Sequence, residues 1–284
     1  MYAATRLIRF ANSENILIMK IQVCAKVNLG LNVVNKRSDG YHDLETVFYP
    51  VNLYDSIEIK ESGRFAFHID GNPIEGDPEK NLVVKAYRMI AAKHSLPEVD
   101  ITLTKWIPVQ AGMGGGSADC AFTIRLLNEQ FHLGMSTGEM QSLAAELGAD
   151  CAFFIEACPA YAEGIGERLS PIPLDLNKYK MAVVKPPIAV STREAFSGIR
   201  VRRPEKCCRD IVMQPVETWK EELKNDFEDS IFPLYPQLQY IKQRLYELGA
   251  TYAAMSGSGS ALFGLFEKEP DIENEFKDCK KWII

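Results

Sequence analysis

The stretch Pro108-Val-Gln-Ala-Gly112-Met-Gly114-Gly-Gly-Ser117 does more than any other segment to decide how this chain folds. Before it, Ile101 and Leu103 alternate with threonines, which predicts a strand, and after it an apolar-rich segment from about Ala118 to Phe131 predicts a helix. Glycines let the backbone approach a ligand closely and adopt positive φ, and the start of a helix offers unpaired N–H groups. The segment therefore predicts a phosphate-binding turn, although a plain tight connection would use the same residues.

Two familiar nucleotide-binding motifs do not match this loop. A Walker loop requires Gly-Lys followed by Ser or Thr, and no glycine of the chain is followed by lysine. The dinucleotide fingerprint Gly-x-Gly-x-x-Gly fails because the sixth position counted from Gly112 is Ser117. The phosphate-binding turn must therefore belong to a different kind of fold.

The segments on either side of the loop predict a mixture of strands and helices. Val, Ile and Leu are frequent over residues 16–59, broken by a turn cluster at 36–40, which predicts consecutive strands. Alternation predicts a further strand over 65–69, and helical periodicity predicts helices over 81–94, 136–147 and 236–248. This order predicts an α+β protein with two lobes, which we place at residues 1–162 and 163–284.

Composition places the chain among ordinary globular proteins. Its 284 residues are 46% hydrophobic and 25% charged, and the formal net charge is −6. A net acidic chain argues against nucleic acid as a partner, and no stretch approaches the roughly 18 apolar residues of a membrane span. Seven scattered cysteines without a C-x-x-C pair indicate a reduced, cytoplasmic protein.

The first eighteen residues stand apart from the rest. Arg6 and Arg9 without early acids are weakly similar to a transit peptide. Met19-Lys20-Ile21 reads as a natural beginning, because the organised pattern starts there. We therefore interpret residues 1–18 as an extension upstream of the natural start.

Several motifs recur in a recognisable order. They are Ala25-Lys26-Val-Asn28-Leu29 followed by Asp39-Gly-Tyr41-His42, the glycine loop from Pro108 to Ala118, Leu147-Gly-Ala-Asp150, and Met255-Ser-Gly-Ser-Gly-Ser260. Together they resemble the GHMP kinases, named for galactokinase, homoserine, mevalonate and phosphomevalonate kinases, and within them the diphosphocytidyl-methylerythritol kinases. The resemblance covers most of the chain, from about Met19 to Phe266. It implies a two-lobed GHMP kinase-like fold with the active site in the cleft between the lobes.

The resemblance also implies an activity. Such kinases use ATP to phosphorylate the 2-hydroxyl of 4-diphosphocytidyl-2-C-methyl-D-erythritol in the non-mevalonate route to isoprenoid precursors, with ADP as co-product. Mg²⁺ is implied without a dedicated cage, with Ser117 as its candidate contact, because phosphoryl transfer needs the metal to neutralise charge. ATP is implied to be held by Pro108, Val109, Gln110, Ala111, Gly112, Met113, Gly114, Gly115, Gly116, Ser117 and Ala118.

Lys26 and Asp150 are the implied catalytic residues. Asp150 would take the proton of the acceptor hydroxyl, while Lys26 would keep Asp150 ionised and offset charge on the transferred phosphoryl group. Asn28 follows Lys26 by two residues, so it shares a strand face with Lys26 and could orient the substrate. The plainer interpretations are a turn or cap for Asp150 and a surface position for Lys26.

The acceptor is implied to carry a cytidine diphosphate group. Tyr41 would stack on the cytosine and His42 would hydrogen-bond its edge, while Gly257, Ser258 and Gly259 would face the phosphates. The plainer interpretations are a surface turn for the first pair, a hairpin for the glycine-rich loop, and helix capping for Ser117.

The chain departs from the family pattern at a few positions. The family usually has Pro where Cys24 stands, Val-Pro in place of Cys151-Ala152, glycine near Gln110 and Ala111, and Asn in place of Asp119. None of these changes removes a group that the chemistry needs.

Two other functions compete with this interpretation. One is a GHMP kinase of homoserine or mevalonate type. Those acceptors carry no base that could stack, so such a kinase would not need Tyr41 and His42. The other is a non-catalytic nucleotide-binding module, which would not require both Lys26 and Asp150.

Overall fold

The computed structural model describes residues 7–11 and 17–284, which divide into two compact units. Unit 1 consists of the described residues up to Ala25, together with Pro50–Val109 and Gly114–Cys158. Unit 2 consists of Lys26–Tyr49, Gln110–Met113 and Pro159–Ile284. Both units mix helices and strands, so the predicted α+β class is confirmed. The units differ from the continuous lobes 1–162 and 163–284, because unit 2 also takes two earlier segments.

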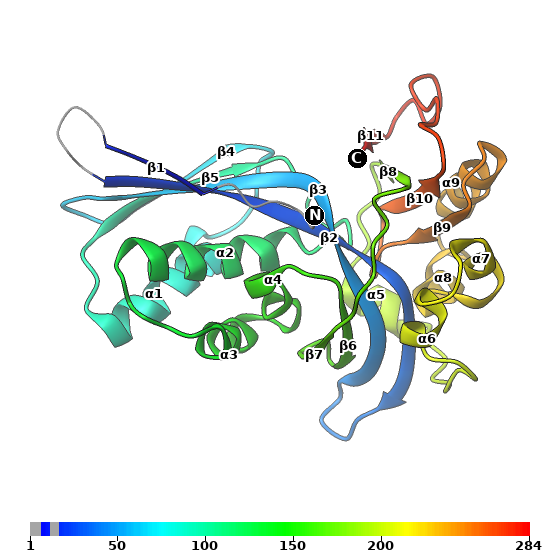
Figure 1. The fold of residues 1–284 in the computed structure, drawn as a ribbon, viewed down its shortest axis with the longest axis horizontal. Coiled ribbons are helices and arrows are strands. Elements are labelled where there is room, and N and C mark those ends of the chain that lie inside the picture. Colours follow the sequence, from blue (N-terminus) through cyan, green and yellow to red (C-terminus); the bar gives the residue numbers. More distant parts are fainter. Residues whose placement is uncertain (1–6, 12–16) are drawn as a thin grey trace. The chain divides into compact units, whose positions relative to one another are not determined.

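Unit 1 is built from a sheet with helices on one face (Figure 1). The strand order is β1-β2-β3-β5-β4, in which β4 and β5 are parallel while β1–β2 and β3–β5 are antiparallel. Strands β2 and β3 each have residues in both units. The bounds are β1 Leu7–Ala11, β2 Leu17–Lys36, β3 His42–Glu61, β4 Ala66–Gly71, α1 Leu82–His94, β5 Val99–Lys105, α2 Gly115–Gln130, α3 Thr137–Leu147 and α4 Phe153–Glu156, with 3-10 turns at Pro78–Lys80 and Ala149–Cys151.

Local sequence accounts for two of the helices that were predicted well, α1 and α3. Helix α1 begins after Asn81, whose side chain accepts the N–H of Val83 at 2.9 Å. Helix α3 opens with the predicted capping box, because the Ser136 N–H donates to Glu139 Oε2 at 2.8 Å and the Glu139 N–H donates to Ser136 Oγ at 3.3 Å. It ends at Leu147, with Gly148 as its C-cap.

Helix α2 begins earlier than the predicted start near Ala118. Its first residue is Gly115, and Gly114 is the N-cap with φ of 70°. Glycine has a low helix propensity, so nothing in the glycine run predicts a helix start. Within this loop Gly112 and Gly114 have positive φ, whereas Gly115 and Gly116 are the first two residues of the helix.

The predicted extension 1–18 contributes in part to the sheet of unit 1. Strand β1 pairs with β2 in an antiparallel register from Leu7 opposite Ile21 to Ala11 opposite Leu17, and Ile18 is buried. Residues 1–6 and 12–16 of that extension lie outside the described residues.

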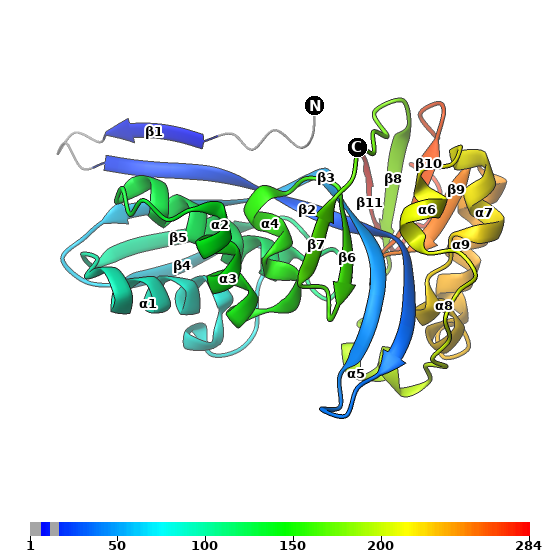
Figure 2. The ribbon, with the colours of Figure 1, turned by 60° about the horizontal axis from the view of Figure 1, so that its bottom comes forward.

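Unit 2 contains an antiparallel four-stranded sheet of order β11-β8-β10-β9, with helices packed against it (Figure 2). Its remaining strands, β6 and β7, pair with each other, and β6 also pairs with β3 at Leu44–Phe48. The bounds are β6 Ala160–Gly164, β7 Arg168–Pro171, β8 Lys180–Lys185, α5 Thr192–Ser197, α6 Cys208–Val212, α7 Trp219–Glu222, α8 Asp226–Ile231, α9 Pro236–Glu247, β9 Tyr252–Met255, β10 Leu262–Phe266 and β11 Lys280–Ile283, with a 3-10 turn at Val216–Thr218.

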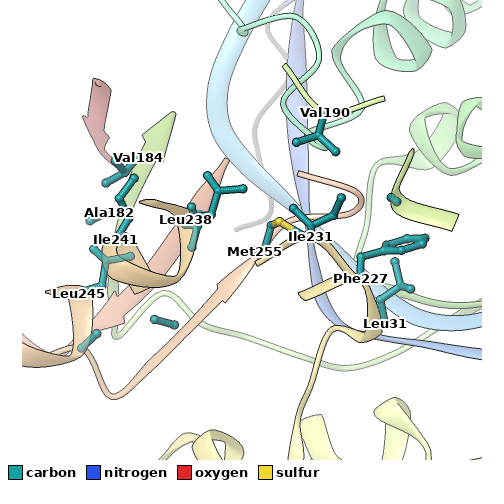
Figure 3. Close-up of a cluster of buried hydrophobic side chains, with 14 of the residues drawn as sticks. Leu31, Ala182, Val184, Val190, Phe227, Ile231, Leu238, Ile241, Leu245 and Met255 are labelled. Carbon is teal, nitrogen blue, oxygen red and sulfur yellow. The ribbon is translucent and has the colours of Figure 1, made fainter. Parts of the chain in front are cut away.

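A hydrophobic cluster fixes the sheet and helices of unit 2 (Figure 3). The predicted stripe of α9 supplies Leu238, Ile241 and Leu245, each at most 1% exposed, and β2 supplies Leu31. Full burial of one such side chain stabilises a protein by about 1.5–3 kcal/mol. Met255 of β9 belongs to the same cluster, which therefore anchors the loop that follows it.

No helix in residues 7–11 and 17–284 combines the length and apolar character that a membrane crossing requires. All seven cysteines are free thiols, and Cys24, Cys120, Cys151 and Cys208 are buried.

Candidate active site

Lys26 and Asn28 lie on β2 in unit 2 and are almost fully buried, at 3% and 2% exposure. The Lys26 ammonium donates to Asn28 Oδ1 at 2.6 Å and to the Gly112 carbonyl at 3.0 Å. Asn28 Nδ2 donates to Thr46 Oγ1 at 3.0 Å, which turns the amide oxygen toward Lys26. The shared strand face is therefore confirmed, and the interpretation of Lys26 as a surface lysine is wrong.

Gly112 of the glycine loop belongs to the same cluster of unit 2. Ser256 Oγ donates to the Gly112 carbonyl at 2.9 Å and accepts the Asn28 N–H at 3.3 Å. A Cβ at Gly112 would lie 1.9 Å from the Ser256 carbonyl oxygen, and φ at Gly112 is +71°, so only glycine fits. At Gly257 a Cβ would lie 3.1 Å from the Gly112 carbonyl oxygen. Three motifs far apart in sequence thus meet in one unit.

The loop that carries Gly257, Ser258 and Gly259 joins the paired strands β9 and β10, so the hairpin interpretation is correct for its backbone. Asn225, 2% exposed, holds this loop by donating from Nδ2 to the carbonyls of Met255 at 2.7 Å and Gly257 at 2.8 Å. Sequence analysis did not predict Asn225. Its only local signal is a position before an acidic helix start, which indicates a cap and says nothing of a distant loop.

The rest of the glycine loop divides between the two units. In unit 2, Gln110 is exposed, Ala111 accepts the Ala261 N–H at 3.2 Å, and Met113 accepts the Lys26 N–H at 3.0 Å. In unit 1, Pro108 is buried and Val109 is 47% exposed.

The first turn of α2 lies in unit 1 and consists of Gly115, Gly116, Ser117 and Ala118. No side chain among the described residues caps it, and the Ala118 N–H donates to the Gly114 carbonyl at 2.8 Å. The N–H groups of Gly115, Gly116 and Ser117 and the positive end of the helix dipole therefore point to an anion. Ser117 is the third residue of the helix, so the interpretation of Ser117 as its cap is wrong. A Cβ at Gly116 would meet no atom within 4 Å.

Asp150 is half-buried in the 3-10 turn that follows α3 in unit 1. A hydrogen bond from Cys120 lowers the pKa of the neighbouring Cys151 thiol, with a smaller contribution from the Ser117 hydroxyl. The turn that carries Asp150 therefore packs beside the first turns of α2. The predicted partnership of Asp150 with Lys26 joins residues of different units and stays a prediction.

Three buried charged residues lie beside the start of α2. The Lys105 ammonium binds a carboxylate oxygen of Asp55 and donates to Asp119 Oδ2 at 2.8 Å. Burial raises the pKa of Asp119, against the opposing effect of Lys105, and the two carboxylates raise the pKa of Lys105 despite its burial. A signal for this group exists in the sequence, because Lys105 and Asp55 each occupy a core-facing position of an alternating strand.

Tyr41 and His42 end the turn between β2 and β3 in unit 2. The Tyr41 N–H donates to Asp39 Oδ1 at 3.0 Å, and its side chain is 62% exposed. The His42 ring stacks on Phe196 with centroids 4.7 Å apart and planes 18° apart. Phe196, which the sequence did not single out, is the aromatic partner of His42.

No group of three or more His, Cys, Asp or Glu side chains suited to a metal ion occurs in the part of the chain that the structure describes. In the first turn of α2, the side chain that offers an oxygen is that of Ser117.

Comparison with known proteins yields close relatives. Family models described as GHMP kinases N terminal domain and GHMP kinases C terminal match residues 81–157 and 209–282. The 4-diphosphocytidyl-2-C-methyl-D-erythritol kinase of Bacteroides fragilis is 52% identical over 252 residues, which cover 87% of this chain and 92% of that protein. A crystal structure of 4-(cytidine 5'-diphospho)-2C-methyl-D-erythritol kinase matches with a TM-score of 0.80 and 32% identity over 93% of this chain and 98% of that one. The mevalonate kinase of Methanococcus jannaschii, 14% identical with a TM-score of 0.71 over 93% of this chain and 97% of its own, shares the fold alone.

Proposed function

Because the chain belongs to the 4-diphosphocytidyl-2-C-methyl-D-erythritol kinases, a family of the GHMP kinases, we propose that it phosphorylates the 2-hydroxyl of that acceptor with ATP. ADP is the co-product, and the reaction belongs to the non-mevalonate route to isoprenoid precursors. The observation that carries the proposal is the buried contact of Lys26 with Asn28 and Gly112, which joins the predicted catalytic strand to the predicted phosphate loop. A nucleotide-binding module would have no need of a lysine buried in this way.

In the proposed reaction Asp150 accepts the proton of the acceptor hydroxyl as its oxygen attacks the γ-phosphorus of ATP. The bond to the β–γ bridging oxygen breaks, and ADP leaves with that electron pair. Lys26 offsets the negative charge on the transferred group, which is the main task of a kinase site. A general base of this kind contributes a factor of about 10²–10⁴ to the rate.

The glycine loop and the first turn of α2 are proposed to bind the phosphates of ATP through backbone N–H groups. The exposed Gly116 and the uncapped start of α2 support this assignment. Mg²⁺ fits a site without a carboxylate cage, since it is commonly held by substrate phosphates and one or two protein groups, here the Ser117 hydroxyl. When bound, Mg²⁺ supplies neutralisation of phosphate charge.

The acceptor is proposed to bind through its cytidine at Tyr41 and His42, with Gly257, Ser258 and Gly259 toward its phosphates. The exposed ring of Tyr41 supports a planar base as the ligand, because it offers a face for stacking. The proposal includes a cytoplasmic location and no nucleic-acid partner, in keeping with the acidic net charge.

A coupled ADP-release assay tests the proposed reaction. We expect turnover with 4-diphosphocytidyl-2-C-methyl-D-erythritol and none above background with homoserine or mevalonate. Asp150→Asn and Lys26→Met should each lower kcat about 10²-fold or more while ATP still binds, because both residues are assigned to the transfer step. Lys20→Met, on the same strand, is the matched control and should keep wild-type turnover. Preference for another acceptor, or near-normal kcat in Asp150→Asn or Lys26→Met, would overturn the proposal.

A further inference from the structure

Lys105, Asp55 and Asp119 form a buried charged triad in unit 1 that the proposed chemistry does not use. Their exposures are 1%, 1% and 2%. Burying charges carries a large desolvation penalty, and replacing such a group by apolar side chains of similar volume is often neutral or stabilising. Stability alone therefore does not account for the triad.

The triad ties together the two ends of the glycine-loop region in unit 1. Asp55 Oδ1 accepts the N–H groups of Trp106 at 2.5 Å and Ile107 at 2.8 Å, which fixes the chain just after β5. The Lys105 ammonium reaches from the end of β5 to Asp119 on α2. The end of the strand and the start of the helix are thus held by one charged centre.

The ammonium of Lys105 lies directly against the first turn of α2. A Cβ at Gly115 would be 3.2 Å from Lys105 Nζ and 3.0 Å from Ile107 Cγ2. The first residue of the helix therefore rests on the lysine and on the residue that Asp55 fixes. Among the residues that the structure describes, Asp119 Oδ1 is buried and has no hydrogen-bond partner, while Lys105 orients the carboxylate through Oδ2. The contacts of Lys105 with both carboxylates fix the position of Asp55 relative to Asp119.

We propose that Lys105, Asp55 and Asp119 are positioning residues for ATP, which hold the first turn of α2 in the orientation that receives a phosphate. The inference rests on the proposed function. Small displacements of a binding group impair a kinase strongly, since a misplacement of about 1 Å can lower the reaction rate about 10²-fold. Because the triad acts through the backbone of the first turn, its loss should weaken ATP binding and leave acceptor binding unchanged.

The triple variant Asp55→Asn/Lys105→Met/Asp119→Leu tests the inference without leaving an unpaired buried charge. We expect a folded protein with a KM for ATP raised about tenfold or more and an acceptor KM within about twofold of wild type. Asp119→Asn, which keeps an oxygen for Lys105, should stay close to wild type in both constants. Thr123→Val, equally buried on the same helix, is the matched control and should lower stability without changing the KM for ATP.

A folded triple variant with an unchanged KM for ATP would overturn the inference and leave the triad a purely structural feature. If the triple variant fails to fold, Asp119→Leu, which keeps the Lys105–Asp55 pair and removes its link to α2, is measured for the same two KM values, and an unchanged KM for ATP in that variant would overturn the inference. Failure of the proposed function would look different, because the wild-type protein would then release no ADP with 4-diphosphocytidyl-2-C-methyl-D-erythritol or would prefer another acceptor.

Discussion

Tyr41 and Tyr240 are exposed to nearly the same extent, 62% and 61%, yet only Tyr41 is assigned to the cytidine. Stacking of a base on an aromatic side chain is worth about 1–3 kcal/mol, so Tyr41→Ala should raise the acceptor KM about ten- to a hundredfold. The KM for ATP should not change, and Tyr240→Ala should alter neither constant. Steady-state kinetics with each substrate varied in turn measures the contrast.

Two outcomes would contradict this assignment of Tyr41. If Tyr41→Ala raised the KM for ATP and the KM for the acceptor equally, the Asp39–Tyr41 segment would have only a structural role. If Tyr41→Ala left the acceptor KM unchanged, the assignment of Tyr41 to the cytidine would be wrong. The catalytic assignments of Lys26 and Asp150 are tested separately.

At the scale of single residues, the sequence singled out Lys26, Asn28, Gly112 and Gly257 because a lysine in an apolar strand and clustered glycines are unusual on their own. The structure brings these four residues into contact, and their roles in the reaction stay a prediction. Asn225 was missed since its role depends on a carbonyl 32 residues away in the chain. Phe196 was missed for a similar reason, since its stacking on His42 depends on tertiary packing.

At the scale of elements, periodicity predicted the existence of the helices better than their starts. The starts of α1 and α3 are predictable because each helix begins after a capping side chain that is recognisable in the local sequence. Helix α2 has a glycine cap and no side-chain cap, so nothing local distinguished its first turn from loop. That missing cap is also what leaves its N–H groups for a phosphate.

Glycines in the first turns of α2 and α3 offer a matched pair for testing the phosphate assignment. Gly116 and Gly138 are helical, without positive φ, and a Cβ at either would meet no atom within 4 Å. Alanine should therefore stabilise both helices, raising the free energy of unfolding by roughly 0.5–1 kcal/mol in each variant. Only Gly116→Ala should weaken the binding of ATP, because its methyl group occupies the space of the approaching phosphate. We expect the Kd for ATP to rise about tenfold, which is about 1.4 kcal/mol.

Isothermal titration calorimetry with ATP, combined with denaturant unfolding, separates the two effects. If Gly116→Ala binds ATP with wild-type affinity, the assignment of the ATP phosphates to this turn is wrong. Weaker ATP binding in Gly138→Ala as well would show that the assay reports a general change in the helices.

At the scale of the whole molecule, the α+β class and the existence of two parts were predictable, but their composition was not. The order of elements along the chain predicts continuous lobes at 1–162 and 163–284. Unit 2 is discontinuous because the pairing of β3 with β6 and the hydrogen bond from Leu31 to Lys224 are long-range contacts. Local propensity carries no information on such partners.

This discontinuity predicts that the segment Pro159–Ile284 will not fold alone. It lacks Leu31 and Val33, which are 3% and 0% exposed in the hydrophobic cluster of unit 2, and their burial is worth about 1.5–3 kcal/mol each. It also lacks the β3 residues that pair with β6, and the Asp226 carboxylate loses the Val33 N–H that donates to it at 2.8 Å. These losses are comparable to the whole stability of a typical domain, about 5–15 kcal/mol. We therefore expect no cooperative thermal transition by circular dichroism and poor amide dispersion in its NMR spectrum. Fusing residues 26–49 to the segment through a flexible linker should restore both signals, whereas cooperative melting of Pro159–Ile284 by itself would show that the earlier strands are dispensable to this core.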